Sequence, residues 1–292
     1  MNQVAVLLTA YNRREKTIQA IDSFKKSSDS LSEYLFDFYL VDDNSTDGTA
    51  KSVLEKFPSV NILHGNGNLF WCRGMNFAWD FASKQKEYDF YIWLNDDVIL
   101  FENAIETIFS SLPSESHRSI ISGAFKSEFS NTVTYGGLIG DDFVIPNGNI
   151  QEIDLLNGNF VLVPKDVFNE VGKFDSRFHH GMGDFDYGLR AKKKGIKSFI
   201  TPEYVGYCER HDDEKLVCYD EKAPLSKRLK FLYSPKGPNP GVNSLFFIRH
   251  SSVYKTISFF VITNFITFFP FFLGKKKKII SGFKKVKFSK KR

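Results

Sequence analysis

The first half of the chain carries four long apolar segments, and helical spacing of apolar residues follows each of them. The segments are residues 4–9, 36–43, 60–65 and 88–94. Their apolarity is continuous rather than alternating, which is typical of parallel strands buried on both faces of a sheet. Strands that alternate with helices in this way predict a doubly wound α/β layer. In such layers, ligands bind beyond the carboxyl ends of the strands.

The apolar periodicity predicts the remaining elements of this layer and of the chain after it. Thr46 is the predicted N-cap of the second helix. Residues 127–160 are rich in Gly, Asn and Thr and predict short strands on a mixed sheet. Residues 212–243 are polar and rich in Pro and Gly and predict a mobile loop. The predicted helices are 13–28, 46–56, 72–86, 102–112, 164–172 and 184–195, and a fifth strand is predicted at 119–125.

Polar residues follow all four apolar segments, so the carboxyl ends of the strands should converge on one polar crevice. These ends are residues 9–12, 42–45, 65–68 and 95–97. The last of them carries Asp96 and Asp97 in succession. Two carboxylates at the end of a buried strand cost several kcal/mol to desolvate unless a positive group meets them. The sequence therefore predicts a cationic partner for this pair.

Charge and motif content exclude several classes of protein. Residues 1–274 hold 29 basic and 34 acidic residues, a net charge of −5, whereas residues 275–292 hold ten basic residues and no acid. An acidic body argues against general nucleic-acid binding. Three cysteines without a CxxC pair suit a reducing compartment and argue against a structural zinc site. Neither a P-loop nor a GxGxxG motif follows the first strand.

Six segments in succession form one recognisable pattern. They are VAVLLTAYNR (4–13), VDDNSTDGT (41–49), GNGNLFWCRGMNFA (65–78), LNDDV (94–98), NGNFVLVPKDVFNEVGKFDSRF (157–178) and GDFDYGLRAKKKG (183–195). In this order they resemble glycosyltransferase family 2, which implies the GT-A fold and use of a nucleotide-sugar. The piece at 65–78 is similar to the bacterial branch that includes rhamnosyltransferases of surface polysaccharides.

The resemblance implies a donor site built from the first four of these segments. Thr9 and Tyr11 would line the nucleobase pocket, and Asp43 would accept from the N3–H of a pyrimidine. A turn-capping role is the alternative for Asp43. Trp71 would border the donor or pack in the core. The remaining donor-binding residues are Arg13, Arg73, Asn76 and Asp96, the last facing the ribose or sugar.

The resemblance also implies a metal centre. Asp97 would bind a divalent cation that bridges the donor diphosphate, and this cation would be the positive partner of the acid pair. The signature reads Asn-Asp-Asp, so one acid of the longer form is missing. His211 would be a second ligand, with a purely structural histidine as the alternative. One carboxylate and one imidazole suit Mn²⁺ or Mg²⁺.

Asp184 corresponds to the catalytic aspartate of the family. In inverting transfer this carboxylate takes the proton of the acceptor hydroxyl as it attacks the anomeric carbon. Asp186 is the rival, and its spacing predicts a pair with Arg190 instead. The acid that usually precedes the base is Gly183 here. Asn157 and Gly158 would approach the acceptor.

The C-terminal region predicts a membrane-associating tail. Residues 257–273 are apolar but short for a spanning helix, and Asn264 and Pro270 interrupt them. With the basic residues behind them, they favour a helix lying on an anionic membrane surface. A helix packed on the catalytic domain is the alternative. The predicted domains are a GT-A domain at 1–245, with halves at about 1–125 and 126–245, and a tail at 246–292.

The sequence thus predicts a metal-dependent inverting glycosyltransferase that uses a UDP- or dTDP-sugar. Its acceptor would be a lipid-linked or cell-surface glycan, and its place the cytoplasmic face of the inner membrane. A processive synthase is one alternative, but the sequence has no QxxRW motif. A non-catalytic nucleotide-sugar-binding or scaffold protein is another, and intact Asp97 and Asp184 argue against it.

Overall fold

The computed structural model describes residues 1–113, 118–210 and 216–273, and they form two compact units. Unit 1 comprises residues 1–179 and 183–210, and unit 2 comprises residues 180–182 and 211–292. Strands and helices build unit 1, whereas the described elements of unit 2 are all helical.

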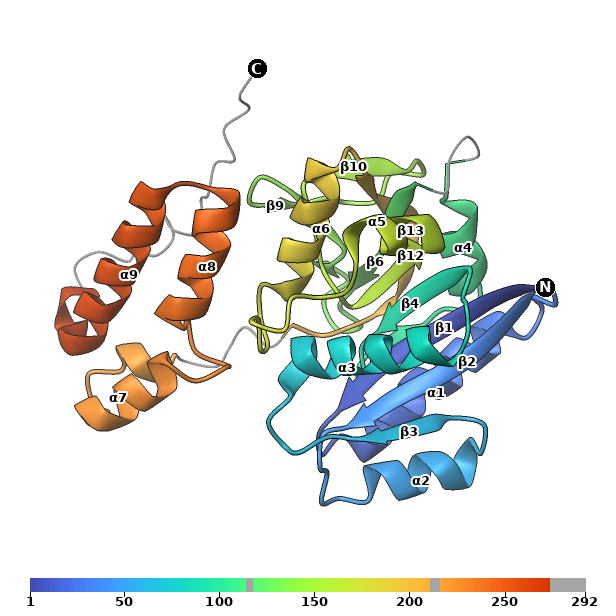
Figure 1. Cartoon of the computed structure of the whole chain (residues 1–292), viewed down its shortest axis with the longest axis horizontal. Coiled ribbons are helices and arrows are strands. Elements are labelled where there is room, and N and C mark those ends of the chain that lie inside the picture. The colour runs from blue at the N-terminus through green and yellow to red at the C-terminus, as the bar shows by residue number, and fades with distance from the viewer. Residues whose placement is uncertain (114–117, 211–215, 274–292) are drawn as a thin grey trace. The chain divides into compact units, whose positions relative to one another are not determined.

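A large mixed sheet forms the centre of unit 1 (Figure 1). Its order is β10-β13-β6-β12-β4-β1-β2-β3, and the four strands from β4 to β3 are parallel. β12 is antiparallel to both β4 and β6, so the predicted fifth strand, β6, does not adjoin β4. The path strands are β1 (Asn2–Ala10), β2 (Tyr34–Asp42), β3 (Asn61–His64), β4 (Phe90–Leu94), β6 (Ser119–Lys126), β10 (Gln151–Ile153), β12 (Phe160–Pro164) and β13 (Lys197–Tyr207).

Five short strands complete this unit. β5 (Ile99–Leu100) pairs with β13, and β7 (Val133–Tyr135) pairs with β6. β11 (Leu155–Leu156), β8 (Gly137–Ile139) and β9 (Asp142–Phe143) form a separate small sheet. The short strands predicted for 127–160 are therefore confirmed. The strand at 197–207 was not predicted from the sequence.

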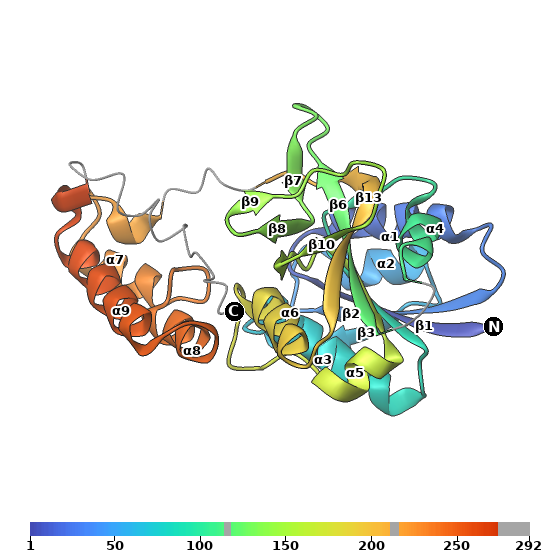
Figure 2. The same cartoon turned by 90° about the horizontal axis from the view of Figure 1, so that it is seen from above.

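Helices cover both faces of the sheet, as the continuous apolar strands require (Figure 2). Ile92 of β4 belongs to the core cluster that includes α1 and α4. Trp93, one residue on, contacts Trp79 of α3 on the other face, with ring centroids 5.6 Å apart. The helices of unit 1 are α1 (Arg14–Ser28), α2 (Thr49–Lys56), α3 (Phe70–Gln85), α4 (Ala104–Ser110), α5 (Lys165–Val171) and α6 (Gly183–Lys193).

The predicted cap of α2 is wrong. The helix begins at Thr49, and its N-cap is Gly48 with a φ of 81°. Asp47 Oδ1 instead accepts hydrogen bonds from the Thr49 amide and hydroxyl. Asp47 rather than Thr46 therefore satisfies donors of the first turn, because the left-handed Gly48 moves the helix start two residues on.

Unit 2 is helical in its described part. It holds η1 (Val217–Tyr219), α7 (Leu225–Leu232), α8 (Pro240–His250), α9 (Val253–Phe268) and η2 (Pro270–Leu273). The loop predicted for 212–243 is wrong over α7 and the start of α8, and residues 211–215 lie outside the described chain. Pro240 stands at the first position of α8, and Asn239 caps it by accepting from Gly241 N at 3.0 Å. Within the described residues, no helix is both long and apolar enough to cross a membrane.

Candidate active site

The acid pair that follows β4 is joined to Arg13, the residue directly before α1. Arg13 Nη1 lies 3.0 Å from Asp96 Oδ1 and 2.7 Å from Asp97 Oδ2. Burial raises the pKa of Asp96 to about 7, against the lowering effect of Arg13. Desolvation lowers the pKa of Arg13, but the two carboxylates more than offset this and raise it. In the structure the positive partner of the pair is therefore Arg13.

Asp43, at the end of β2, holds the loop that leads into α3. Its Oδ1 accepts from Gly67 N at 2.8 Å, and its Oδ2 accepts from Leu69 N and Phe70 N at 2.9 and 3.1 Å. Only glycine fits at position 65, because a Cβ there would lie 2.5 Å from Asp43 Oδ1. The side chain thus fixes the loop by three backbone donors, and its contact with a nucleobase stays a prediction.

The end of β1 is fixed to its neighbours by close packing and hydrogen bonds. A Cβ at Gly74 of α3 would lie 2.3 Å from Thr9 Oγ1, so Thr9 touches the backbone of that helix. Asn12 adopts a positive φ of 51°, and its Oδ1 accepts from Thr46 N at 2.7 Å. Tyr11 is 55% exposed between these two anchored positions. It is thus open to a ligand that enters at this edge.

The first turns of α3 carry the other predicted donor-binding residues. Arg73 Nε donates to Ser176 O at 2.8 Å, and Trp71 Nε1 donates to Asn95 Oδ1 at 2.6 Å. Asn76 Oδ1 is buried without a hydrogen-bond partner in the described part of the chain. The Trp71–Asn95 bond ties α3 to the residue directly before the acid pair. Asn95 was not among the predicted site residues, although its adjacency to the pair was a signal.

Asp184 lies in the first turn of α6, against the segment that precedes β12. Its Oδ2 accepts from Gly158 N at 3.0 Å, and its Oδ1 accepts from Phe185 N at 2.9 Å. Burial raises the pKa of Asp184 to about 6, although these amides lower it. A Cβ at Gly158 would lie 2.4 Å from Trp71 Cη2, so only glycine lets Trp71 and this amide come so close. Asp184 is therefore a desolvated carboxylate held by neutral donors.

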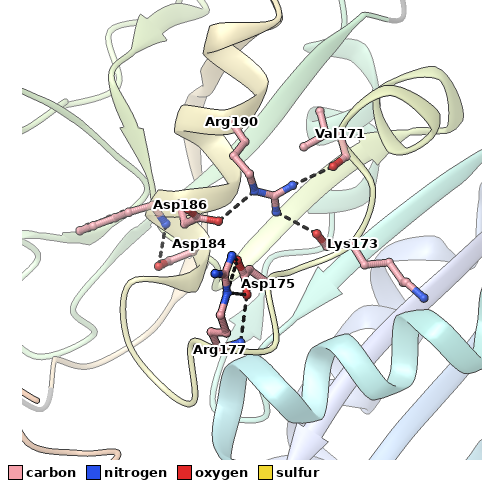
Figure 3. A network of polar contacts seen from close by, with 8 residues as sticks. Val171, Lys173, Asp175, Arg177, Asp184, Asp186 and Arg190 are labelled. Carbon is pink, nitrogen blue, oxygen red and sulfur yellow. Dashed lines mark hydrogen bonds and ion pairs between the residues drawn. The ribbon is translucent and has the colours of Figure 1, made fainter. Parts of the chain in front are cut away.

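The neighbours of Asp184 have structural contacts. Asp186, which is fully buried, pairs with Arg190 at 2.9 Å, as predicted. Arg190 also donates to the carbonyls of Val171 and Lys173, so this network ties α6 to the end of α5 and to the segment after it (Figure 3). A Cβ at Gly183 would lie 2.3 Å from Cys72 Sγ, and no acid fits there.

Pairing of β4 with β12 brings the acid pair and the Asp184 segment together. Phe160 is in register with Leu94, and Asn95 N donates to Asn159 O at 2.8 Å. Cys208, just after β13, adds a third segment: its Sγ lies 3.4 Å from Asn159 Nδ2 and 3.9 Å from Asp97 Oδ1. Cys208 was missed from the sequence, because a lone cysteine gives no signal of its own.

Asn157 and His211 are the last of the predicted site residues. Asn157 Oδ1 accepts from Gly136 N at 3.3 Å, so this side chain is bound to backbone on the acceptor-side half. His211 lies outside the described residues. Among the residues that are described, no group of three His, Cys, Asp or Glu side chains is placed to hold a metal ion. The metal and acceptor assignments thus stay predictions.

Known proteins resemble this chain in sequence family and in fold. The family model described as "Glycosyl transferase family 2" matches residues 5–169, more than half of the chain. A search of curated proteins gave no match. The solved structures with similar folds include GalNAc-T7 with UDP, GalNAc and Mn²⁺, at 14% identity and a TM-score of 0.55 over 80% of this chain and 48% of that one.

Two further structures share the fold. Staphylococcus aureus (S. aureus) TarS is 14% identical, with a TM-score of 0.54 over 87% of this chain and 44% of TarS. The mannosyltransferase PcManGT from Pyrobaculum calidifontis, in complex with GDP-Man and Mn²⁺, is 12% identical, with a TM-score of 0.54 over 92% of this chain and 87% of that one. This chain thus spans about half the length of the first two. The mixed α/β architecture fits the GT-A fold.

Proposed function

We propose a specific reaction for this chain, which belongs to glycosyl transferase family 2 and is therefore a glycosyltransferase. It moves one sugar from a UDP- or dTDP-sugar with inversion at the anomeric carbon. The acceptor we propose is a lipid-linked or cell-surface glycan, as in the rhamnosyltransferase-like branch. GalNAc-T7 was solved with UDP and PcManGT with GDP-Man, which supports a nucleotide-sugar donor. The place of action, the cytoplasmic face of the inner membrane, is part of the same proposal.

The observation that carries this proposal is the setting of Asp184. A general base works best when its pKa lies near the operating pH, and burial raises the pKa of Asp184 to about 6. Its two oxygens accept from backbone amides, which hold the carboxylate in one orientation. Asp184 then takes the proton from the acceptor hydroxyl while that oxygen forms the new bond to the anomeric carbon and the bond from this carbon to the nucleoside diphosphate breaks.

The acid pair fits a divalent cation, Mn²⁺ or Mg²⁺. Asp96 and Asp97 supply the oxygen donors that such hard cations prefer, and the guanidinium of Arg13 already meets both carboxylates. Asp97 would hold the ion, with His211 as second ligand and Asp96 toward the ribose or sugar. When bound, the cation would stabilise the charge of the leaving diphosphate.

The remaining proposed contacts surround this centre. Asn157 and Gly158 border the acceptor side, where Gly158 N already binds Asp184. Arg73, near the start of α3, donates through Nε to the Ser176 carbonyl. Its other guanidinium nitrogens make no hydrogen bond within the described residues, so we assign them to the donor phosphates. The donor contacts we assign are Thr9, Tyr11, Arg13, Asp43, Arg73, Asn76 and Asp96.

Calorimetry with UDP and with dTDP tests the cation bridge. The diphosphate and the acid pair are both anionic, so we expect affinity for either nucleotide to be lost in EDTA and in Asp97→Ala. Asp29→Ala, which removes an exposed acid on unit 1 outside the proposed site, is the matched control and should bind as the wild type does. Equal affinity with and without Mn²⁺ would contradict the bridge.

A further inference from the structure

The helix α9 of unit 2 is apolar on its outward side as well as on the side that it buries. Its inward side carries Thr263, Ile266 and Thr267, which are 4%, 7% and 0% exposed, and its outward side also carries large apolar side chains. The inward hydroxyls are satisfied within the helix, Thr263 by Phe259 O at 2.6 Å and Thr267 by Thr263 O at 2.9 Å. A surface helix normally turns its apolar stripe to the core. An outward side that is apolar as well indicates that this side is matched to an apolar environment.

The outward apolar residues form one continuous stripe, called here the outward face of α9. Their spacing of three or four residues places them on one side of the helix. The single amide along it, Asn264, is bonded on both ends: its Nδ2 donates to Phe260 O, and its Oδ1 accepts from Tyr233 at 2.8 Å. The face consists of Ile257, Phe260, Val261, Phe265 and Phe268, each between 45% and 58% exposed.

Charge is segregated along the same chain. Residues 1–215 hold 22 basic and 32 acidic residues, a net charge of −10, whereas residues 216–273 hold seven basic and two acidic residues, a net charge of +5. Residues 274–292 add ten basic residues. Within α7, Lys227 and Lys230 are exposed. The part of the chain that carries the apolar face is thus also the strongly cationic part.

We propose that unit 2 docks on an anionic lipid surface, with the outward face of α9 entering the headgroup boundary and the basic residues of 216–273 bound to lipid phosphates. Apolar burial and electrostatic attraction are the two signals that stable attachment requires. A lipid surface fits better than a protein partner because it offers hydrocarbon and anionic groups in the same layer. The docking rests on the place of action proposed above and deepens it, whereas the transfer reaction is tested separately by donor hydrolysis.

Flotation with vesicles tests the docking on the full-length protein. One set contains phosphatidylcholine alone, and another contains about one third phosphatidylglycerol. The wild type should bind the anionic vesicles at least tenfold more tightly, and salt should release it only in part, since apolar burial is not screened. Ile257→Ser with Phe260→Ser and Phe265→Ser should lose at least tenfold of this affinity. The matched control removes three exposed apolar side chains of unit 1, Phe129→Ser, Ile139→Ser and Ile145→Ser.

A single-site reporter keeps the test decisive if the triple variant fails to fold. The three tryptophans of the chain lie at 71, 79 and 93, so unit 2 has none. Phe265→Trp should shift to shorter emission wavelength on anionic vesicles and be quenched by acyl-brominated lipid. Phe129→Trp, at an 86% exposed position of unit 1, should do neither. Donor hydrolysis in the same samples reports separately on the reaction.

Three results would overturn the proposal. The first is wild-type protein that stays off anionic vesicles, or a folded triple variant that binds them as the control does. The second is a lipid-free dimer that the triple substitution converts to a monomer without vesicle binding, which assigns the face to a second copy. The third is a chain lacking residues 274–292 that binds phosphatidylcholine vesicles more tightly than the full chain, which assigns the face to that segment.

Discussion

Asp184 and Asp186 are two positions apart at the start of α6, yet their surroundings differ in kind. Asp184 accepts from backbone amides, whereas Asp186 is buried against the Arg190 guanidinium. We expect Asp184→Asn to lower kcat for sugar transfer by about 10²-fold or more, because an amide cannot take the acceptor proton. Nucleotide affinity should be unchanged. Single-turnover kinetics and calorimetry measure the two quantities.

Asp186→Asn is the matched comparison and should behave in the opposite way. Removing one partner of a buried ion pair costs about 3–5 kcal/mol of unfolding free energy. Its thermal midpoint should therefore fall, whereas the remaining folded enzyme should keep most of its kcat. Near-full activity in Asp184→Asn together with a folded but inactive Asp186→Asn would mean that Asp186 is the base.

The raised pKa of Asp184 predicts how activity and stability depend on pH. The base works only when ionised, so kcat/KM should fall as the pH drops below about 6. The folded pKa also exceeds the ordinary value of 3.8, so the native state binds more protons than the unfolded state between these two pH values. The unfolding free energy should therefore fall as the pH rises from about 4 to 6. The difference between urea titrations of wild type and of Asp184→Asn isolates this contribution, because the raised pKa of Asp96 acts in both proteins.

Arg13 neutralises the acid pair and thereby competes with any other cation for it. Arg13→Met should lower the unfolding free energy at pH 8 by about 1–2 kcal/mol, a modest cost because Arg13 is 38% exposed. Mn²⁺ should restore this loss and should bind the nucleotide-free variant about tenfold more tightly than the wild type. Arg14→Met, at a 46% exposed neighbour bound to Glu15, is the control. Weaker Mn²⁺ binding by Arg13→Met would show that Arg13 does not compete.

At the scale of whole elements, the sequence correctly predicted the strands whose position depends on a local pattern of apolar residues. The parallel strands β1 to β4 are confirmed, because continuous apolarity reports burial on both faces. The insertion of β12 between β4 and β6 was not predictable, since pairing between strands far apart in the chain leaves no local pattern. The loop predicted around residue 240 was wrong for a physical reason: Asn239 and Pro240 begin α8 as its cap and first residue rather than end a helix.

The candidate site likewise contains residues that local motifs indicate and contacts that only the folded chain brings together. Asp96, Asp97 and Asp184 lie in motifs that are contiguous in the sequence, so the sequence alone could nominate them, and their roles stay predictions. The pairing of Arg13 with the acid pair joins segments far apart in the sequence and appears only in the folded protein. The three amides that Asp43 accepts from are backbone groups, which carry no residue type and so leave no signal in the sequence.

The contact between α3 and the segment before β12 gives a prediction at this scale. Gly158→Ala would bring a Cβ within 2.4 Å of Trp71, so the two segments must move apart. Overpacking of this kind costs about 1–3 kcal/mol. Because Gly158 N also holds Asp184, we expect kcat for transfer to fall more than nucleotide affinity does. At Gly181 an added Cβ meets no atom within 4 Å, so Gly181→Ala is the control and should leave both unchanged.

At the scale of the whole molecule, the two units differ in the secondary structure that they contain. Unit 1 contains the complete sheet and the helices on both of its faces. A chain ending at residue 215 keeps these elements and His211, and removes every described helix of unit 2. We expect it to unfold cooperatively with a thermal midpoint within about 2–4 °C of the full chain, because the core of unit 1 is intact.

The same truncation separates attachment from chemistry. It changes the net charge from +5 to −10 and removes the outward face of α9, so it should not bind anionic vesicles. Donor hydrolysis should persist, because every proposed catalytic and metal-binding residue precedes residue 212. A chain that ends at 245, the predicted domain boundary, is cut within α8. Trypsin should therefore cleave it within residues 216–245 faster than it cleaves the full chain there. Aggregation of the chain ending at 215, together with a stable chain ending at 245, would place the boundary at 245 and make residues 216–245 part of the catalytic domain.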